Sequence, residues 1–379
     1  MKPKILLVAN WDWVLYNFRL PLARALRKSG AEVLLVSPPG KYIDHFQAEG
    51  FQWVPWKLER RSTNPFREAA AVFDLYQIYH DQNPDAVHHI TIKPIFYGSL
   101  VARFQRTNVV INTFTGLGYL FSEREKARRL RRWVLPLLRL VFKSPDFHFV
   151  FLNQEDRDTL ISRRVVPKDQ SRIIQSDGVN LDRFHPSAHE REDGDSPVVL
   201  MAARLLWDKG IAEFVEAARM IKNQGIEGKF WVAGEPDPGN PACVPKDVLA
   251  KWKAEGPVEF LGHQGNMSQL LQMVDVAVLP SYHEGVPAFL LEAAASGLPL
   301  VASDISGCQV VVDEGKNGIL IPPGNATKLA QAITPLLLDP EKRFQMGKES
   351  RKIAIARFDQ RMINQSYIGL YKELGVGLK

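Results

Sequence analysis

The chain has 379 residues, which is too long for one ordinary core and predicts about two domains at the usual length of roughly 100 to 200 residues each. With 45% hydrophobic and 24% charged residues, the composition is that of a globular protein and excludes a disordered or fibrous chain. The net charge of +6 is a modest basic bias that fits phosphorylated substrates, anionic lipid or nucleic acid.

The N-terminal segment and the cysteines restrict the compartment. The apolar run at residues 5–9 is too short for a signal peptide and has no cleavage pattern, so secretion is not expected. Cys243 and Cys308 have no metal-ligand spacing around them, which predicts neither a disulfide framework nor a zinc site and fits a reducing cytoplasm. Since Pro136 and Arg139 interrupt the best apolar stretch, any membrane contact is expected to be peripheral.

The first half of the chain alternates short β-branched runs with helical periodicity. The expected strands are residues 5–9, 33–37, 86–90, 109–113 and 147–152, and the first helix is expected at residues 18–28. Gly30 stands where a helix C-cap is expected. This alternation predicts a parallel sheet covered on both faces.

A polar segment at residues 185–197 loses all apolar periodicity and reads as a linker. Beyond it the alternation restarts, with strands expected at residues 198–202, 230–233, 258–261, 276–279 and 300–302. The predicted fold class is α/β, with two doubly wound Rossmann-like domains that face each other across a cleft. Ligands are expected in that cleft, at the carboxyl ends of the strands.

The first motif, at residues 201–210, leaves a strand and enters a helix at residues 211–222. Arg204 and Lys209 lie beside the N-terminus of that helix, and two cations with free backbone N–H groups suit a diphosphate. Taken alone, the same segment also fits a solvated Arg and Lys on a loop.

The second motif places Glu284 and Glu292 on either side of seven residues. Gly285 permits a tight turn and Pro287 suits the first helical position, so Glu284 is expected on a loop and Glu292 inside a helix. Glu292 is expected to accept hydrogen bonds from sugar hydroxyls, since a carboxylate among apolar neighbours usually has a partner. The alternative is a carboxylate on the helix surface.

Two further strands end in glycine, at Gly234 and at Gly262. Either glycine would let the backbone approach a base or a phosphate, although such glycines are commonly plain turns.

With these motifs the chain resembles glycosyltransferase family 4, retaining enzymes of the GT-B fold, over essentially its whole length. The resemblance implies a nucleotide-sugar substrate, no cofactor and no catalytic metal, and no clustered Asp-x-Asp motif is present. It also implies domains at residues 1–184, for the acceptor, and 185–356, for the nucleotide sugar, and a helix at residues 357–379 that crosses back to the first domain.

The resemblance assigns the motif residues to roles. Glu284 would face the transferred sugar as a catalytic residue, and the expected donor-binding residues are Arg204, Lys209, Glu292, Gly262, His263, Gly234, Val286 and Pro287.

Residues 10–19 link the first expected strand to the first expected helix and mix aromatic and polar side chains. Asn17 and Arg19 are expected to contact the acceptor, although Asn17 equally suits a helix N-cap. The glycine triplet of a dinucleotide enzyme is absent from this turn, which argues against a dehydrogenase.

Two more strand ends are expected to open onto the cleft. We expect Lys93, Thr115, Gly116 and Gly118 to bind an acceptor phosphate. His89 is the candidate acid or base, beside His88, although a histidine at a strand end is more often a core residue.

Eight basic and only two acidic residues lie between residues 123 and 143. At residues 128–142, from Arg128 to Phe142, apolar side chains recur every three or four positions with arginines between them, which is typical of an interfacial membrane helix. A helix docked on its own domain with a solvated basic face fits the pattern equally well.

The resemblance therefore implies a retaining glycosyltransferase that moves a sugar, such as an N-acetylhexosamine, from a UDP-sugar to a polyprenyl-diphosphate-linked or other glycan. The resemblance suggests the lipid-linked branch, and the expected location is cytoplasmic, peripheral on the inner face of the cytoplasmic membrane and held by anionic lipid. Two alternatives stay open: a nucleotide-sugar epimerase, or a GT-B enzyme with a soluble acceptor. A nucleic-acid partner is not expected, because few aromatic residues accompany the basic run.

Overall fold

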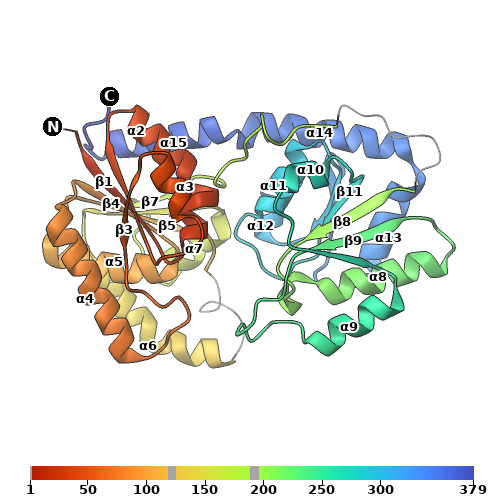
Figure 1. Ribbon diagram of the computed structural model, residues 1–379, viewed down its shortest axis with the longest axis horizontal. Coiled ribbons are helices and arrows are strands. Elements are labelled where there is room, and N and C mark those ends of the chain that lie inside the picture. Colours follow the sequence, from red (N-terminus) through yellow and green to blue (C-terminus); the bar gives the residue numbers. More distant parts are fainter. Residues whose placement is uncertain (1, 118–124, 188–195) are drawn as a thin grey trace. The chain divides into compact units, whose positions relative to one another are not determined.

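The computed structural model describes residues 2–117, 125–187 and 196–379. The chain forms two compact units (Figure 1). The N-terminal unit comprises Met1–Asp177 and Arg361–Lys379, and the C-terminal unit comprises Gly178–Gln360. The first boundary lies earlier than the expected 184/185, because Leu181 and Phe184 pack in the core of the C-terminal unit.

The N-terminal unit contains a seven-stranded parallel sheet with the order β3-β2-β1-β4-β5-β6-β7. Its strands are β1 (Lys4–Ala9), β2 (Glu32–Ser37), β3 (Gln52–Pro55), β4 (Ala86–Ile90), β5 (Val109–Phe114), β6 (Phe147–Phe151) and β7 (Ser171–Ile173). Successive residues of β1 enter opposite cores, with Ile5 and Leu7 on one face and Leu6 and Val8 on the other. This two-faced burial explains why the central strands read as continuous apolar runs.

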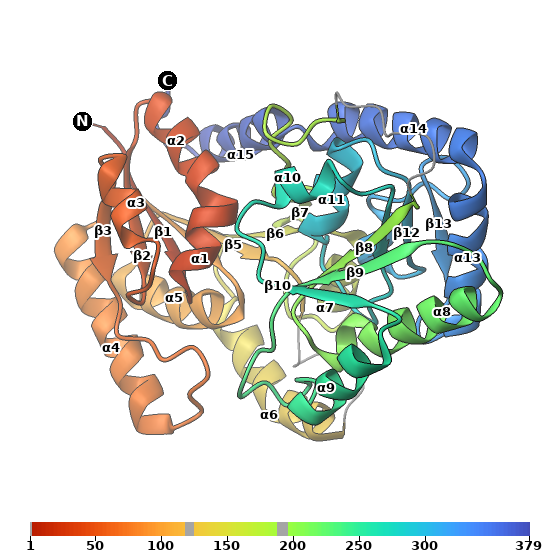
Figure 2. The same cartoon turned by 45° about the vertical axis from the view of Figure 1, so that its right-hand side comes forward.

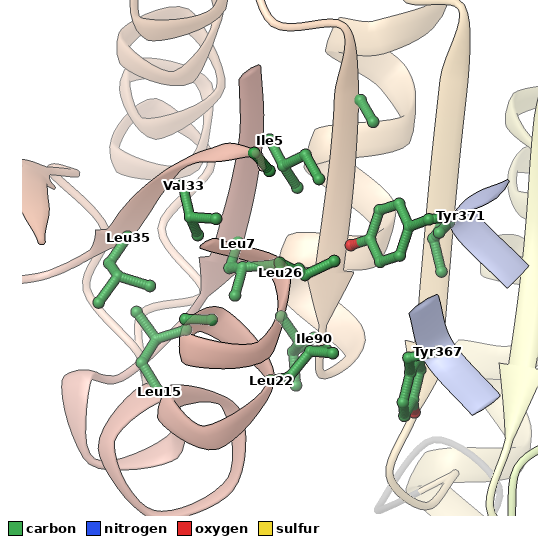
Figure 3. Close-up of a cluster of buried hydrophobic side chains, with 14 of the residues drawn as sticks. Ile5, Leu7, Leu15, Leu22, Leu26, Val33, Leu35, Ile90, Tyr367 and Tyr371 are labelled. Carbon is green, nitrogen blue, oxygen red and sulfur yellow. The ribbon is translucent and has the colours of Figure 1, made fainter. Parts of the chain in front are cut away.

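Helices cover both faces of this sheet. One face carries α2 (Leu20–Lys28), α3 (Ile43–Ala48) and α15 (Gln360–Glu373), and Figure 3 shows Tyr367 and Tyr371 of α15 in the same cluster as Leu22 and Leu26 of α2. The other face carries α4 (Pro65–Gln82), α5 (Ile92–Gln105), α6 (Glu125–Val141) and α7 (Gln154–Ser162). The last helix of the chain is therefore part of the N-terminal unit's core.

The C-terminal unit contains a six-stranded parallel sheet with the order β10-β9-β8-β11-β12-β13. Its strands are β8 (Val198–Ala202), β9 (Lys229–Ala233), β10 (Glu259–Gly262), β11 (Val276–Leu279), β12 (Leu300–Ser303) and β13 (Gly318–Ile321). One face is covered by α10 (Met267–Leu271), α11 (Ala288–Ala295), α12 (Ser306–Gln309) and α14 (Pro340–Phe358), and the other by α8 (Ile211–Asn223), α9 (Lys246–Glu255) and α13 (Ala326–Leu338).

The structure confirms the expected α/β class and the two doubly wound sheets. Two local features were not expected. Residues 12–19, expected to link the first strand to the first helix, are themselves helical: α1 (Asp12–Val14) and the π-helical turn η1 (Leu15–Arg19) run directly into α2. The edge strands β3, β7 and β13 were also not expected.

The two segments that leave the C-terminal unit run side by side. Val179 bridges Asp359, its N–H donates to Phe358 O at 2.8 Å, and Gln360 N–H donates to Val179 O at 3.1 Å. Gly178 has φ +76°, and a Cβ there would lie 2.6 Å from Gln360 Cα. Only glycine therefore fits where the first segment passes the second.

Gly178→Ala is expected to lower the free energy of unfolding by about 3 kcal/mol, because it adds a backbone collision to the strain of a positive φ. Gly225→Ala is the matched control: its φ is +73°, and nothing lies within 4 Å of the added Cβ, so about 1 kcal/mol is expected. Urea unfolding of both variants measures the difference. Equal losses would contradict the close approach.

Candidate active site

The motif residues of the C-terminal unit meet at the point in the sheet where the strand order changes direction. From β8 the chain proceeds through α8 to β9 on one side, whereas β11 and β12 lie on the other side of β8. Helices α8 and α11 pack on opposite faces of the sheet. Ligands of open α/β sheets bind at such a switch point, outside the carboxyl ends of the strands.

Lys209 and Glu284 form an ion pair at this point. Lys209 ends the short 3-10 turn η3 (Trp207–Lys209) before α8, and Glu284 lies in the loop after β11. Lys209 Nζ lies 2.6 Å from Glu284 Oε1, and the two side chains are 18% and 13% exposed. The pair therefore joins the β8 and β11 loops while each group stays within reach of a ligand.

Backbone contacts fix the two loops against each other. Tyr282 N–H donates to Asp208 O at 2.9 Å. Gly210, with φ +76°, lies so close to the carbonyl of Pro280 that a side chain there would collide with it. The position of Glu284 relative to Lys209 is thus set by the main chain as well as by charge.

A third loop, after β12, packs beneath Glu284 and was not singled out from the sequence. Gly307 of α12 lies directly against the carbonyls of Glu284 and Gly285, leaving no room for a Cβ. Burial raises the pKa of the Cys308 thiol, and the nearby Glu284 carboxylate adds to this effect. The available signal was the Ser306-Gly307-Cys308 run directly after an apolar strand.

The remaining donor residues continue along the same edge of the sheet. Arg204 follows β8, where Nη1 lies 2.7 Å from Asp237 Oδ2 and the side chain is half-exposed. Gly234, at the end of β9, lies against Ala203 O, and its N–H donates to Gly262 O at 2.8 Å. His263 is exposed beside Gly262. Backbone and cations therefore line the edge from β10 to β11.

Glu292 lies inside α11, as expected, and Pro287 is the N-cap rather than the first helical residue. Val286, the residue before Pro287, packs against the apolar core. Desolvation raises the pKa of Glu292 to about 7, against the opposing charge of Arg183. Glu292 is partly exposed, and among the residues described here no hydrogen bond to its carboxylate is present, so the carboxylate is available to a ligand hydroxyl.

His89 is a core residue and not a candidate acid or base. It is fully buried, with Nε2 at 2.6 Å from Tyr79 Oη and Nδ1 at 2.7 Å from Asn112 Oδ1. Burial lowers its pKa to about 4. His88 is likewise buried and bonded through both ring nitrogens, to Tyr371 and Thr113. Neither ring has a nitrogen left for a substrate.

Arg19 does not occupy the expected position, whereas Asn17 stays accessible and its contact with the acceptor remains a prediction. Asn17 is exposed inside η1, where Nδ2 donates to Trp13 O at 2.9 Å, so it is not an N-cap. The guanidinium of Arg19 is buried, forms an ion pair with Asp177 and lies 5.4 Å from the ring centroid of Tyr367. Arg19 thus joins the first helical segment to α15 and is closed to an acceptor.

Lys93 is already saturated. Nζ lies 2.9 Å from both carboxylate oxygens of Glu68 and donates to the carbonyls of Ser62, at 2.7 Å, and Glu59, at 3.2 Å. These contacts fix the segment before α4 to α5. Lys93 Nζ therefore has no N–H group left for an acceptor phosphate, contrary to the expectation.

Two residues at the carboxyl edge of the N-terminal sheet stay accessible. Thr115 and Gly116 follow β5 and are partly exposed, and Gly116 has φ +138°. Gly118 lies outside the described residues. Thr91, after β4, was not singled out: its φ of 73° is rare for a β-branched residue, and its Oγ1 is buried without a partner.

The basic helix α6 docks on its own unit over its C-terminal half. Leu138, Val141 and the following Phe142 are buried in the core, whereas Leu137 and Leu140 are exposed. The side chains of residues 125–130, 132 and 133 lie outside the described part. Leu138, Val141 and Phe142 therefore face the core and not a membrane.

No helix within the described residues is long and apolar enough to cross a bilayer. Nor do the described side chains include a group of three or more His, Cys, Asp or Glu residues that could hold a metal ion.

Comparison with known proteins places this geometry in context. The family model "Glycosyl transferases group 1" matches residues 183–353, and "Glycosyl transferase 4-like" matches residues 4–147. The N,N'-diacetylbacillosaminyl-diphospho-undecaprenol alpha-1,3-N-acetylgalactosaminyltransferase of Campylobacter jejuni is 30% identical over 94% of this chain and 95% of its own. An Escherichia coli UDP-Gal:alpha-D-GlcNAc-diphosphoundecaprenol alpha-1,3-galactosyltransferase is 24% identical over 69% and 68%.

Solved structures share the fold. A glycosyltransferase from Rickettsia africae superposes with a TM-score of 0.79 at 19% identity, covering 99% of each chain. The sucrose-phosphate synthase of Thermosynechococcus elongatus gives 0.80 at 22% identity, again covering 99% of each chain.

His89 predicts a dependence of stability on pH. Its folded pKa of about 4 lies below the value of about 6.5 in an unfolded chain, so the unfolded state binds more protons between these values. About 3 kcal/mol of stability is therefore lost as the pH falls from about 6.5 to about 4. His89→Gln should flatten this loss in urea unfolding.

At neutral pH, His89→Gln is expected to destabilise the protein by about 2 kcal/mol, because it breaks buried hydrogen bonds. Turnover of the folded variant should stay within about twofold of the wild type, since general acid–base groups contribute about 100-fold or more. A folded, equally stable variant that had lost turnover would restore His89 to the active site.

Proposed function

The chain belongs to the group 1 glycosyltransferase family, and on that premise we propose that it moves a sugar from a UDP-sugar to a polyprenyl-diphosphate-linked glycan. Two relatives support this acceptor class, since both are named for diphospho-undecaprenol-linked substrates, and the second is named for a UDP-linked donor. The proposed sugar is an N-acetylhexosamine, after the Campylobacter jejuni relative that is 30% identical over 94% of the chain. The proposed stereochemical course is retention.

The observation that carries the proposal is the Lys209–Glu284 contact at the switch point of the C-terminal sheet. In the proposed complex, Lys209 and Arg204 bind the donor diphosphate beside the N-terminus of α8. Glu292 accepts hydrogen bonds from the ribose, and the residues at Gly262 border the base.

Glu284 changes partner in the proposed mechanism. Without a donor, its carboxylate neutralises Lys209 at 2.6 Å. A bound diphosphate carries two negative charges and competes for the ammonium, which leaves Glu284 to bind the hydroxyls of the transferred sugar. Lys209 and Arg204 then stabilise the negative charge that develops on the departing UDP.

Bond changes follow from this arrangement. The bond between the sugar C1 and the diphosphate oxygen breaks, and its electron pair leaves with UDP. An acceptor hydroxyl oxygen bonds to C1. Because His88 and His89 are buried and fully bonded, the proposal gives the acceptor's proton to the departing diphosphate oxygen.

The acceptor is assigned to the carboxyl edge of the N-terminal sheet. Thr115 and Gly116 are partly exposed there, Thr91 Oγ1 is buried without a hydrogen-bond partner, and Asn17 is exposed in η1. A polyprenyl-diphosphate acceptor is anchored in a bilayer, so the proposed location is the cytoplasmic face of the membrane, with the enzyme bound peripherally.

The experiment combines UDP- and GDP-sugars with a short polyprenyl-diphosphate-linked sugar in detergent, and measures nucleotide release together with product mass. Release of UDP that requires the lipid-linked acceptor is expected. Release with a soluble sugar but not with the lipid would replace the acceptor class. Conversion of the donor without any acceptor would favour the epimerase alternative.

Lys209→Met is expected to lower kcat/KM about 100-fold, because a cation at the departing charge is lost. Lys229→Met is the matched control: Lys229 starts β9 at the amino edge of the same sheet and is exposed. Initial rates of UDP release measure both variants. A loss of similar size in the two would remove Lys209 from the site.

The raised pKa of Glu292 predicts that the affinity for the donor depends on pH. Its pKa of about 7 means that the carboxylate ionises as the pH rises through neutrality, and the ionised form accepts ribose hydroxyl hydrogen bonds more strongly. The KM for the donor should therefore fall between pH 6 and about 8. Glu292→Gln should raise KM about tenfold and abolish this dependence. A variant that kept the wild-type pH profile would assign the titration to another group.

A further inference from the structure

The outward face of α4 is mostly aromatic and small, and its exposed charge is Asp81 at the C-terminal end of the helix. Seven residues of this helix lie on that face and are exposed: Phe66, Ala69, Ala70, Phe73, Tyr76, Gln77 and His80. Phe66 is 84% exposed and Phe73 is 61% exposed, and the ring of Phe73 stacks with that of Tyr76 at 6.5 Å between centroids. A surface helix normally places charged residues on this side. Contiguous exposed apolar surface marks an interaction site.

The apolar surface continues onto the C-terminal ends of α5 and α6. Gln105 Nε2 donates to Tyr76 O at 2.7 Å, which brings Phe104, 74% exposed, beside the α4 face. Arg103 Nη1 donates to Lys143 O at 2.5 Å and thereby joins the end of α5 to the end of α6. Figures 1 and 2 show α4, α5 and α6 side by side on the sheet. We call this surface the α4–α6 face.

Positive charge predominates at the ends of α5 and α6, while the exposed carboxylates beside the α4–α6 face are those of Asp81 and Asp146. Residues 103–106 and 137–143 contain four basic residues and no acidic one. The four are exposed and are Arg103, Arg106, Arg139 and Lys143. Exposed aromatic rings next to arginine and lysine match the interface of an anionic bilayer, where rings enter the headgroup region and cations meet lipid phosphates.

We propose that the α4–α6 face docks the enzyme on an anionic lipid bilayer. The proposal rests on the proposed function, since a lipid-linked acceptor brings the enzyme to such a surface. It also differs from the expectation based on residues 128–142, because Leu138, Val141 and Phe142 are core residues. The docking side chains are instead Phe73, Tyr76 and Phe104, with Leu137 and Leu140 beside them.

Charge argues against a second copy of the chain as the occupant. A two-fold dimer through this face would be isologous and would bring the four cations of each copy towards those of the other. Like charges across an interface are costly, and the four cations outnumber the exposed carboxylates of Asp81 and Asp146 beside them. A negatively charged bilayer balances the same four charges.

The direction of the helices connects this face to the acceptor. In a parallel sheet, the helix that follows a strand starts at the carboxyl edge. Helices α4, α5 and α6 follow β3, β4 and β5. A bilayer that lies along the three helices therefore reaches the edge at Thr115 and Thr91, where the acceptor is assigned.

The test is sedimentation of the full chain with phosphatidylcholine vesicles, with and without phosphatidylglycerol and without any acceptor. The wild type should bind only the anionic vesicles, and added salt should weaken binding. The double variant Phe73→Ser/Phe104→Ser should lower the partition coefficient about tenfold or more. Phe344→Ser is the matched control, because Phe344 is 63% exposed on α14, and its binding should be unchanged.

A second pair separates charge from apolar burial. Arg106→Gln/Lys143→Gln should lower the partition coefficient about 30-fold, since each cation near an anionic surface contributes about fivefold. Lys348→Gln, exposed on α14, is its control. Unfolding temperature and UDP release with a detergent-dispersed acceptor check that each variant is folded.

The outcomes distinguish this inference from the proposed function. Equal binding to neutral and anionic vesicles, or equal loss in Phe73→Ser/Phe104→Ser and Phe344→Ser, would overturn the docking face while leaving lipid-dependent UDP release intact. A wild-type dimer in analytical ultracentrifugation that Phe73→Ser/Phe104→Ser dissolves would assign the face to a second copy instead. Anionic-vesicle binding without transfer to the lipid-linked sugar would uphold the face and refute the proposed acceptor.

Discussion

The reversal of the chain's course between β8 and β11 is the constraint on which the candidate site depends. Because α8 and α11 pack on opposite faces of the sheet, the loops before them diverge and leave the carboxyl ends of two adjacent strands uncovered. Lys209 and Glu284 pair across this gap, and Gly210 and Gly307 allow the backbones around them to approach closely. The residues are thus held in place by a fold whose own stability does not require their charges.

Burial acts differently on the titratable groups of the two units. His89 loses its charge on burial, and both ring nitrogens are satisfied by Tyr79 and Asn112, so the group stabilises a unique core arrangement. Glu292 is also desolvated, but its carboxylate has no hydrogen bond among the residues that the structure describes. Glu292 is also partly exposed, so its carboxylate is accessible, and a hydrogen bond from a ligand hydroxyl would stabilise the bound state. This difference separates a structural polar residue from a binding one.

The sequence predicted the central strands and the loops that carry Arg204, Lys209 and Glu284, because apolar runs and strand-end glycines are local signals. It could not predict the partner of a polar side chain. Arg19 pairs with Asp177, 158 residues away, and Lys93 pairs with Glu68, 25 residues away, so both read as free cations. The apolar stripe at residues 128–142 predicted a helix correctly. It did not show whether the apolar side of that helix faces the core or a bilayer, since the same periodicity suits both. The aromatic face of α4 was missed because its alanines and aromatics follow no strong pattern.

The central claim is that the donor diphosphate and Glu284 compete for Lys209. Calorimetric titration of UDP into Glu284→Gln tests it most directly, because this variant keeps the shape of the loop and removes the competing charge. The account predicts that UDP binds the variant at least as tightly as the wild type while sugar transfer is lost. Binding of UDP weakened as much as in Lys209→Met would contradict it, since Glu284 would then be part of the diphosphate site itself.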